Sequence, residues 1–169
     1  MAFDGITMAN LTWEFKQTLE GGRIQKIAQP EKDELILTIK GNRKTIRLQI
    51  SASASLPLIY EASQNKPSPM TAPGFCMLLR KHFTGGRLLE VRTLPDERIL
   101  FFDFQCTNEM GDTVVNTMAA ELMGRYSNLV LVQTKNPANP AAEGKIIDAL
   151  KRVDFEDSEV RQLLPGLAY

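Results

Sequence analysis

The feature that most constrains the fold of this chain is a short pattern that occurs twice. Gly21-Gly22-Arg23 and Gly85-Gly86-Arg87 each follow an amphipathic helical segment, and each opens an apolar strand. A proline turn, an Asp-Glu pair and a second apolar strand then follow in both copies. A helix that packs on its own hairpin, used twice, predicts an antiparallel sandwich with helices at its edges. Chance recurrence of common turn residues is the alternative, because the shared residues are mostly glycine and proline.

Hydrophobic spacing around this pattern indicates two helices and a series of strands. Leu11, Phe15 and Leu19 recur every four residues, which predicts a helix over about 6–19. Pro73 suits the first turn of a second helix over 74–83. Strands are expected over 23–29, 34–40, 44–50, 88–94, 98–106, 113–122 and 129–132, and a loop over 61–73. The stretch 113–122 is ambiguous between strand and helix, and its β-branched residues favour a strand.

Length and composition indicate a single α+β domain. The chain has 169 residues, of which 43% are hydrophobic and 24% charged, which is ordinary for a globular domain with its own core. We expect residues 1–133 to form a β-rich core with two helices and residues 134–144 to form a loop. Residues 145–169 are expected to form a helical segment, with helices over 146–151 and 158–164.

The charge balance excludes a nucleic-acid binder that works through overall basic charge. Lysine plus arginine and aspartate plus glutamate each number 20, so the formal net charge is zero, and any contact with nucleic acid must be a local patch. Residues 1–100 carry a net charge of +4 and residues 101–169 carry −4. A modest basic face is conceivable where five cations fall close together: Arg80, Lys81, Arg87, Arg92 and Arg98. Charge alone favours an ordinary solvated face.

Catalytic and metal sites find little support in the sequence. His82 is the only histidine and Cys76 and Cys106 are the only cysteines, and they give no metal-ligand spacing. A Ser–His–Asp triad would have to use His82 inside an apolar and basic helical segment, so an ordinary helical histidine is favoured. There is no P-loop or G-x-G-x-x-G, no apolar run long enough to span a membrane and no signal peptide. We therefore expect a reduced, cytoplasmic protein without cofactors.

Arg98 is the first candidate for a polar contact. The two copies, laid side by side, place Arg98 level with Leu35, in register with the apolar residues of its strand. An unpaired arginine is costly to bury there, so it lies at the rim beside the turn or is held by Asp96 or Glu97. A rim arginine with an acidic neighbour can form a polar pair that recognises a ligand. The alternative is a gatekeeper charge at the end of the strand, without a role in binding.

The second candidate is the segment from Glu121 to Asn128, which contains Gly124-Arg125-Tyr126-Ser127. Glycine allows a close backbone approach or a positive φ. Arginine, serine and asparagine offer hydrogen-bonding groups that suit phosphate, sugar or base contacts. A strand-to-strand corner tied by its own side chains fits the same residues.

The chain resembles the N-terminal domain of the NFACT family, which includes ribosome quality-control factors and bacterial proteins named fibronectin-binding protein A. Several segments in a fixed order carry this resemblance over nearly the whole chain. They are Phe3-Asp4-Gly5, Gly21-Gly22-Arg23-Ile24, Glu34-Leu35, the stretch from Phe75 to His82, Asp96-Glu97-Arg98-Ile99, Asn108-Glu109-Met110-Gly111-Asp112, the stretch from Glu121 to Asn128, and Leu164-Pro165-Gly166.

The resemblance implies a longer protein and a fold similar to the N-terminal domain of formamidopyrimidine-DNA glycosylases. Family members bind the large ribosomal subunit that carries an obstructed nascent chain as peptidyl-tRNA, together with tRNA. They promote C-terminal tailing without mRNA, with alanine in bacteria, which implies alanine tRNA as a partner. The implied tRNA- or RNA-binding residues are Asp96, Glu97, Arg98, Glu121, Gly124, Arg125, Ser127 and Asn128. The family usually has aspartate immediately before the arginine, so either Asp96 or Glu97 can be the partner carboxylate.

Two other classes of function stay open beside an RNA-binding module of ribosome rescue. One is a surface adhesin for fibronectin or another matrix protein, which the missing signal peptide disfavours. The other is a nucleic-acid enzyme. The glycosylases use an N-terminal proline amine as their nucleophile, whereas Ala2 and Phe3 follow Met1 here, so no enzyme activity is expected.

Overall fold

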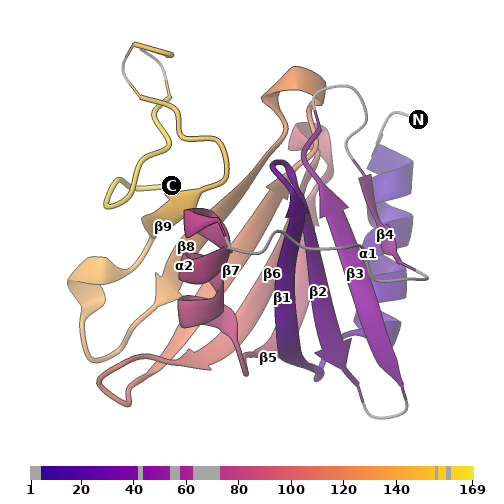
Figure 1. The fold of residues 1–169 in the computed structure, drawn as a ribbon, viewed down its shortest axis with the longest axis horizontal. Coiled ribbons are helices and arrows are strands. Elements are labelled where there is room, and N and C mark those ends of the chain that lie inside the picture. Colours follow the sequence, from indigo (N-terminus) through magenta and orange to yellow (C-terminus); the bar gives the residue numbers. More distant parts are fainter. Residues whose placement is uncertain (1–4, 42–43, 54–57, 63–72, 155, 159–160) are drawn as a thin grey trace.

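A computed structural model of the chain describes residues 5–41, 44–53, 58–62, 73–154, 156–158 and 161–169. The helices, strands and short 3₁₀ turns of these ranges are shown in Figure 1. In chain order they are α1 (Gly5–Thr18), β1 (Arg23–Glu31), β2 (Glu34–Lys40), β3 (Thr45–Ser51), β4 (Leu58–Glu61), α2 (Gly74–Phe83), β5 (Arg87–Leu94), η1 (Pro95–Glu97), β6 (Ile99–Thr107), β7 (Thr113–Glu121), η2 (Gly124–Tyr126), β8 (Asn128–Lys135), η3 (Pro140–Ala142) and β9 (Lys145–Ala149). The α+β class is confirmed, and residues 63–72 of the expected loop lie outside the described ranges.

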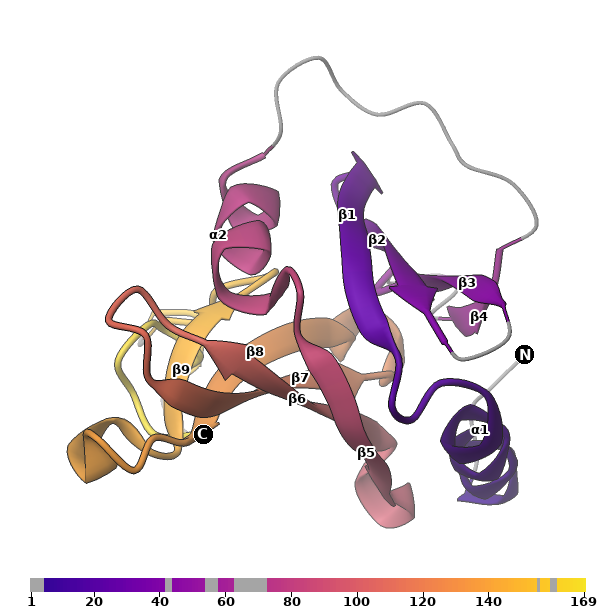
Figure 2. The same ribbon diagram turned by 90° about the horizontal axis from the view of Figure 1, so that it is seen from below.

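All nine strands of the described ranges belong to one antiparallel sheet, in the order β4-β3-β2-β1-β5-β6-β7-β8-β9. Strands β1 and β5 meet through a single residue pair, Arg23 opposite Arg87, before they diverge. Figure 2 shows the two parts of the sheet, β1–β4 and β5–β9, turning away from each other at this junction. We call these parts the first and second leaf. The expected mainly antiparallel β-structure is confirmed, and backbone hydrogen bonds join its two leaves into one bent sheet.

The internal repeat is structural. The backbone hydrogen bond from Gly21 N to Leu88 O, 2.7 Å, has a counterpart from Gly85 N to Ile24 O, 2.9 Å. Both hairpins also carry a β-bulge at the same place, after Ile24 in β1 and after Leu88 in β5. Each leaf thus begins with a helix and continues as an antiparallel meander, related by an approximate twofold axis between β1 and β5. This confirms the expectation of two similar units.

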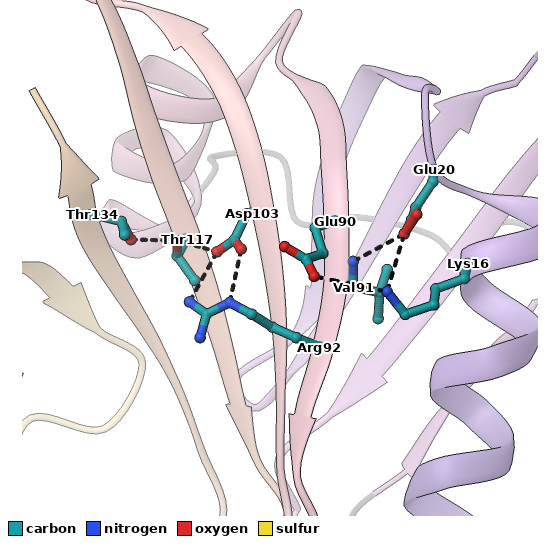
Figure 3. Close-up of polar contacts among 8 residues, drawn as sticks. All are labelled: Lys16, Glu20, Glu90, Val91, Arg92, Asp103, Thr117 and Thr134. Carbon is teal, nitrogen blue, oxygen red and sulfur yellow. Dashed lines mark hydrogen bonds and ion pairs between the residues drawn. The ribbon is translucent and has the colours of Figure 1, made fainter.

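The helices, however, pack across the junction of the leaves. α1 packs against β5 and β6 of the second leaf, and α2 packs against β1 of the first leaf and β6 of its own. At equivalent points, the Arg80 side chain of α2 donates to Ile27 O in β1 at 3.0 Å, and Glu20, just after α1, accepts from Val91 N in β5 at 3.3 Å (Figure 3). The expectation that each helix packs on its own hairpin is therefore wrong for α1, which the Gly-Gly turn directs across the axis. α2 contacts its own hairpin through β6 as well as β1 of the other leaf.

The second glycine of each turn is required by close packing. A Cβ on Gly22 would lie 2.7 Å from Ile39 Cγ2, and one on Gly86 would lie 2.8 Å from Phe83 O. Real Cβ atoms do not approach other atoms this closely, so a side chain at either position would push the helix end off the strand. The repeated Gly-Gly pair therefore marks the point where helix, turn and neighbouring strand meet.

Both helices cover the same face of the sheet, where the main core lies. The Phe15 ring of α1 packs 6.0 Å from that of Phe102, and the Phe83 ring of α2 packs 5.8 Å from that of Phe104. Phe102 and Phe104 are alternate residues of β6 and so point to the same side. No helix in the described ranges is long and apolar enough to cross a membrane.

The C-terminal segment differs from the expected pair of helices. Residues Lys145–Ala149 form the edge strand β9, and Leu163 pairs with Val153 in an isolated bridge. Residues 159–160 lie outside the described ranges, and the rest of 158–164 is not helical. This segment covers the outer face of the second leaf and buries a second small core: Ile99, Phe101, Ala119, Val130, Val132, Ile146, Ala149 and Leu163. The need to cover those apolar outer residues explains a strand and an irregular segment in place of helices.

Candidate nucleic-acid interface

The turn between β5 and β6 presents three of the expected residues to solvent. Asp96 and Glu97 lie in η1, Arg98 follows, and all three are exposed. Arg98 precedes the first residue of β6 and so lies at the rim. Among the described residues, no ion pair within 4 Å joins Arg98 to either carboxylate. The guanidinium group is therefore available to a ligand.

Arg98 adopts a backbone conformation that an arginine rarely takes. Its φ is +55°, the only positive φ of a non-glycine residue in the described ranges. The left-handed region costs a residue with a Cβ roughly 1–2 kcal/mol, and such strain persists only where the surroundings impose it. Here the Arg98 carbonyl accepts a hydrogen bond from Leu122 N at 3.0 Å. The neighbouring strand connection thus helps to hold the Arg98 backbone in this conformation.

In the structure, the residue of the first copy that corresponds to Arg98 is not the one expected from the sequence. The register sets Lys40 opposite Arg23 and Gln105 opposite Arg87. Counting back along β2 and β6 from these pairs places Arg98 level with Asp33, and Leu100 level with Leu35. The expectation that Arg98 matches Leu35 is wrong, because the two turns differ in length.

The corner after β7 presents an exposed arginine and an exposed aromatic ring. Gly124 has a φ of +58° and begins η2, which turns the chain so that Arg125 and Tyr126 both face solvent. The Arg125 guanidinium lies 4.8 Å from the centroid of the Tyr126 ring, and its Nη2 donates to Tyr126 Oη at 2.6 Å. A guanidinium plane next to an aromatic ring offers both stacking and hydrogen bonding to an unpaired base.

Two other residues of this corner hold it together from inside. Ser127 is fully buried, and its Oγ accepts a hydrogen bond from Met123 N at 2.9 Å. Asn128 is also buried, and it donates to Lys151 O at 2.7 Å and accepts from Lys151 N at 2.9 Å. The alternative of a corner tied by its own side chains is therefore confirmed for these two residues, and contact of the segment with a ligand stays a prediction. Ser127 and Asn128 tie the corner, while the exposed Arg125 can reach a ligand.

Glu121 is also taken up by the fold. Its side chain is 1% exposed and accepts two hydrogen bonds from Arg161, at 3.1 and 2.5 Å, and one from the Tyr169 hydroxyl at 2.5 Å. Burial, followed by the Glu121 charge, raises the pKa of Tyr169 well above its usual range. The hydrogen bond to Glu121 likewise raises the pKa of Arg161. Sequence spacing could not find Arg161 or Tyr169, because both lie about 40 or more residues further along the chain.

The turn and the corner lie at the same end of the second leaf. The hydrogen bond from Leu122 N to Arg98 O joins their backbones. A groove of about 530 Å³ at this place is lined by Leu94, Glu97, Ile99, Phe101, Met123, Arg161 and Tyr169. Of the expected residues, the structure thus gathers exposed Asp96, Glu97, Arg98 and Arg125 with half-exposed Gly124, above buried Glu121, Ser127 and Asn128.

The conceivable basic face does not form from the five clustered cations. Arg92 makes two hydrogen bonds to Asp103, at 2.8 and 3.1 Å, and Figure 3 shows this pair continuing to Thr117 and Thr134. Lys81 pairs with Glu109 at 3.1 Å, and Arg80 binds the backbone of β1. The remaining two, Arg87 and Arg98, lie at opposite ends of the β5–β6 hairpin.

His82 has the surroundings of an ordinary helical residue. Its backbone carbonyl accepts a hydrogen bond from Asn116 at 2.9 Å. Partial burial, and then the neighbouring charge of Lys81, lower the pKa of its imidazole. Both cysteines are free and buried. No cluster of potential metal ligands occurs among the described residues.

Comparison with known proteins gives consistent matches over the whole chain. Residues 4–169 match the family model described as NFACT N-terminal and middle domains. The chain is 37% identical to proteins named Rqc2 homolog RqcH from Streptococcus suis and Bacillus subtilis. It is matched over its full length and covers 29% and 28% of theirs. It therefore spans less than a third of these curated relatives.

A solved structure matches the fold equally well. The chain superposes with a TM-score of 0.89 on the N-terminal domain of the fibronectin-binding protein PavA from Streptococcus pneumoniae. The sequences are 33% identical, and the match covers 99% of this chain and 61% of the other.

Proposed function

The chain belongs to the NFACT family, and we propose on that premise that it is the RNA-binding module of a ribosome quality-control factor. The relatives named Rqc2 homolog RqcH support this assignment at the level of the family. In the proposed function the module is the first part of a longer cytoplasmic protein. That protein binds the large ribosomal subunit with its obstructed peptidyl-tRNA, and binds alanine tRNA for C-terminal tailing without mRNA.

The observation that carries the proposal for the site is that Arg98 is exposed, has a positive φ and forms no ion pair within the described residues. A strained backbone holds its side chain outward, and no carboxylate of the described residues forms an ion pair with it. A free guanidinium can grip a phosphate or the edge of a base with two parallel hydrogen bonds. Glu97, which lines the groove, is better placed than Asp96 to accept from a base amino group beside it. Arg125 and Tyr126 add a stacking surface at the same end.

The remaining expected site residues support this surface from below. Glu121, Ser127 and Asn128 are buried and bonded within the protein, so in our proposal they shape the corner and do not touch RNA. Gly124 supplies the turn. The proposed module performs no chemistry of its own and uses no cofactor. The proposed similarity to formamidopyrimidine-DNA glycosylases is one of fold only.

Binding to fibronectin is the second candidate function. The observation that favours it is the likeness to a structure named as the N-terminal domain of a fibronectin-binding protein. The Arg98→Ala variant described next separates the two candidates, since nothing in the proposed binding to a matrix protein depends on Arg98.

The test of the proposed function uses the full-length protein that carries this chain. It is pelleted with obstructed large ribosomal subunits, the bound tRNA is sequenced, and tailing of the nascent chain is measured. We expect Arg98→Ala to weaken tRNA binding about 5–150-fold, because it removes a polar interaction worth ~1–3 kcal/mol, and to abolish or strongly reduce tailing.

Lys32 provides the matched control, because it is an exposed cation at the corresponding turn of the first leaf. Lys32→Ala is expected to tail normally. The melting temperature of this domain should hardly change with Arg98→Ala, because a rim charge is worth less than ~1 kcal/mol. Normal tailing by a folded Arg98→Ala protein would reject the site. Retention of immobilised fibronectin without binding to ribosomes would favour the second candidate.

A further inference from the structure

A second set of cations lies at the other end of the β5–β6 hairpin. The register places six outward residues directly opposite one another across neighbouring strands: Lys40, Arg23, Arg87, Gln105, Val115 and Lys135. We call them the transverse row. At ~4.8 Å per strand the row is about 24 Å long. It contains four cations and no acidic residue, and all four cations are exposed.

The middle of this row is unfavourable for an isolated protein. Arg23 has Lys40 opposite it on one side and Arg87 on the other. Like charges directly opposite one another destabilise a sheet. Within the described ranges none of the four cations forms an ion pair. Elsewhere the same sheet neutralises its outward arginine, as Asp103 does for Arg92. The row thus keeps a charge repulsion that a single acidic substitution would relieve.

The two arginines also line a common hollow. A polar cavity of about 530 Å³ is bounded by Arg23 and Arg87, with Gln105 and three threonines beside them: Thr84, Thr107 and Thr113. Arg23 Nη1 reaches across the twofold axis and donates to Gly85 O at 3.2 Å, which orients its guanidinium over the junction of the leaves. Two guanidinium groups with an amide and hydroxyls are the donors that bind phosphate oxygens in proteins.

We propose that the transverse row is a second RNA contact, in which Arg23 and Arg87 bind the phosphodiester backbone. Charge complementarity selects the occupant, because the row is a line of cations long enough for several phosphates of one strand. It lies about 23 Å from Arg98, counted over the seven residues from Gln105 to Arg98 at ~3.3 Å per residue. An RNA molecule that contacts Arg98 at one end of the hairpin can therefore also contact the row at the other.

This inference rests on the proposed function, in which RNA is the ligand. It adds a contact to the RNA backbone that does not depend on the RNA sequence. Phosphate contacts fix the position of a nucleic acid and make its binding depend on salt. The row would therefore anchor RNA, whereas Arg98 would contribute to what is recognised.

The test measures binding of this chain to a fluorescent tRNA at several salt concentrations, starting at about 50 mM. The double variant Arg23→Gln/Arg87→Gln is expected to bind about tenfold more weakly at the lowest salt. The slope of log affinity against log salt should also become shallower by about 0.7–0.9 for each phosphate that the variant no longer neutralises. Arg23→Lys/Arg87→Lys, which keeps the charge, should restore most of the affinity and the slope.

Lys32→Gln is the matched control for removal of one exposed positive charge, and it should leave both values unchanged. The glutamine double variant should melt at the same temperature as the wild type or slightly higher, because it removes like-charge repulsion. A lower melting temperature would mean that the arginines are structural, and would overturn the proposal.

Other outcomes separate this proposal from the proposed function. An unchanged affinity and salt slope in the glutamine variant, together with weaker binding by Arg98→Ala, would overturn the row alone. If the wild-type chain leaves tRNA unbound at low salt, both proposals fail. Tighter binding to polyglutamate than to tRNA would identify an acidic protein as the occupant and overturn the assignment to RNA.

Discussion

Two glutamate–arginine combinations lie side by side at one end of the second leaf, and they differ in almost every respect. Glu97 and Arg98 are adjacent in sequence, exposed and not ion-paired with each other. Glu121 and Arg161 are 40 residues apart, yet they form a two-pronged ion pair with the carboxylate buried. Their backbones are close, since Glu121 pairs with Ile99, the residue after Arg98.

The difference shows that sequence adjacency of opposite charges says little about pairing. A buried carboxylate must have its hydrogen bonds satisfied by the protein, or the fold loses several kcal/mol. An exposed carboxylate is satisfied by water and gains little from a neighbour. Consequently the pair that stabilises the domain is the distant one, and the pair that is free for a ligand is the adjacent one. Each prediction below changes one side of this contrast.

The largest effect is expected from breaking the buried pair. Arg161→Ala leaves the buried carboxylate of Glu121 without its cation, so that the Tyr169 hydroxyl alone still donates to it from the C-terminal segment. We expect the free energy of unfolding to fall by about 3 kcal/mol at neutral pH, measured by urea denaturation. Arg161→Lys should lose less, because it keeps the charge but not the fork. If the free energy of unfolding falls by less than about 1 kcal/mol, the buried Glu121–Arg161 pair contributes no more to stability than an exposed pair would.

A smaller effect is expected from the hydroxyl that shares Glu121. Tyr169→Phe removes one hydrogen bond to a charged group and should cost about 1–2 kcal/mol at pH 7. The folded state raises the pKa of Tyr169, by burial first and by Glu121 second. The stability that this raised pKa provides is complete below the ordinary tyrosine pKa of about 10 and is lost as pH rises towards the folded value.

Denaturation of wild type and Tyr169→Phe at a series of alkaline pH values isolates that contribution. The stability difference between them should stay constant up to about pH 9 and shrink above pH 10. A difference that is independent of pH would mean that the folded state does not raise the pKa of Tyr169.

The smallest change in stability is expected at Arg98 of the exposed Glu97–Arg98 combination, and it is an increase. Arg98→Gly relieves the positive φ of +55°, a gain partly offset by the greater freedom of glycine in the unfolded chain. We expect stability to rise by about 0.5–1 kcal/mol, whereas Arg98→Ala retains the strain and should change it little. Thermal denaturation of the two variants side by side measures this. Lower stability for Arg98→Gly than for Arg98→Ala would show that the backbone there is not strained.

Local sequence patterns predicted the helices and strands around the repeat. They failed where a segment distant in sequence determines the secondary structure. The helix over 74–83 and the strand over 34–40 match the structure because capping, turns and periodicity all favour them. Residues 146–151 were expected to be helical, whereas Lys145–Ala149 is the strand β9. It forms a strand because the exposed edge of β8 offers backbone partners, and spacing within the segment does not reveal that edge.

The candidate site was predictable to a similar extent. That Arg98 lies at the rim followed from the cost of burying an unpaired charge. The residue of the first copy that corresponds to Arg98 could not be found from the sequence. The number of residues between the proline and the Asp-Glu pair differs between the two turns, so the sequence does not give the register. The burial of Ser127 and Asn128 was one of two open alternatives, and only the hydrogen bonds to Met123 and Lys151 decide it.

The packing of α1 against the second leaf has a consequence for how the chain is synthesised. When the first leaf emerges from the ribosome, β5, against which α1 packs, has not yet been translated. The apolar side of α1 must therefore wait for about 70 further residues before it is covered. Contacts so distant in sequence raise the contact order and slow folding, and surface left exposed meanwhile invites aggregation. The domain is consequently expected to gain its stable core in one late step, once both leaves are complete, and not leaf by leaf.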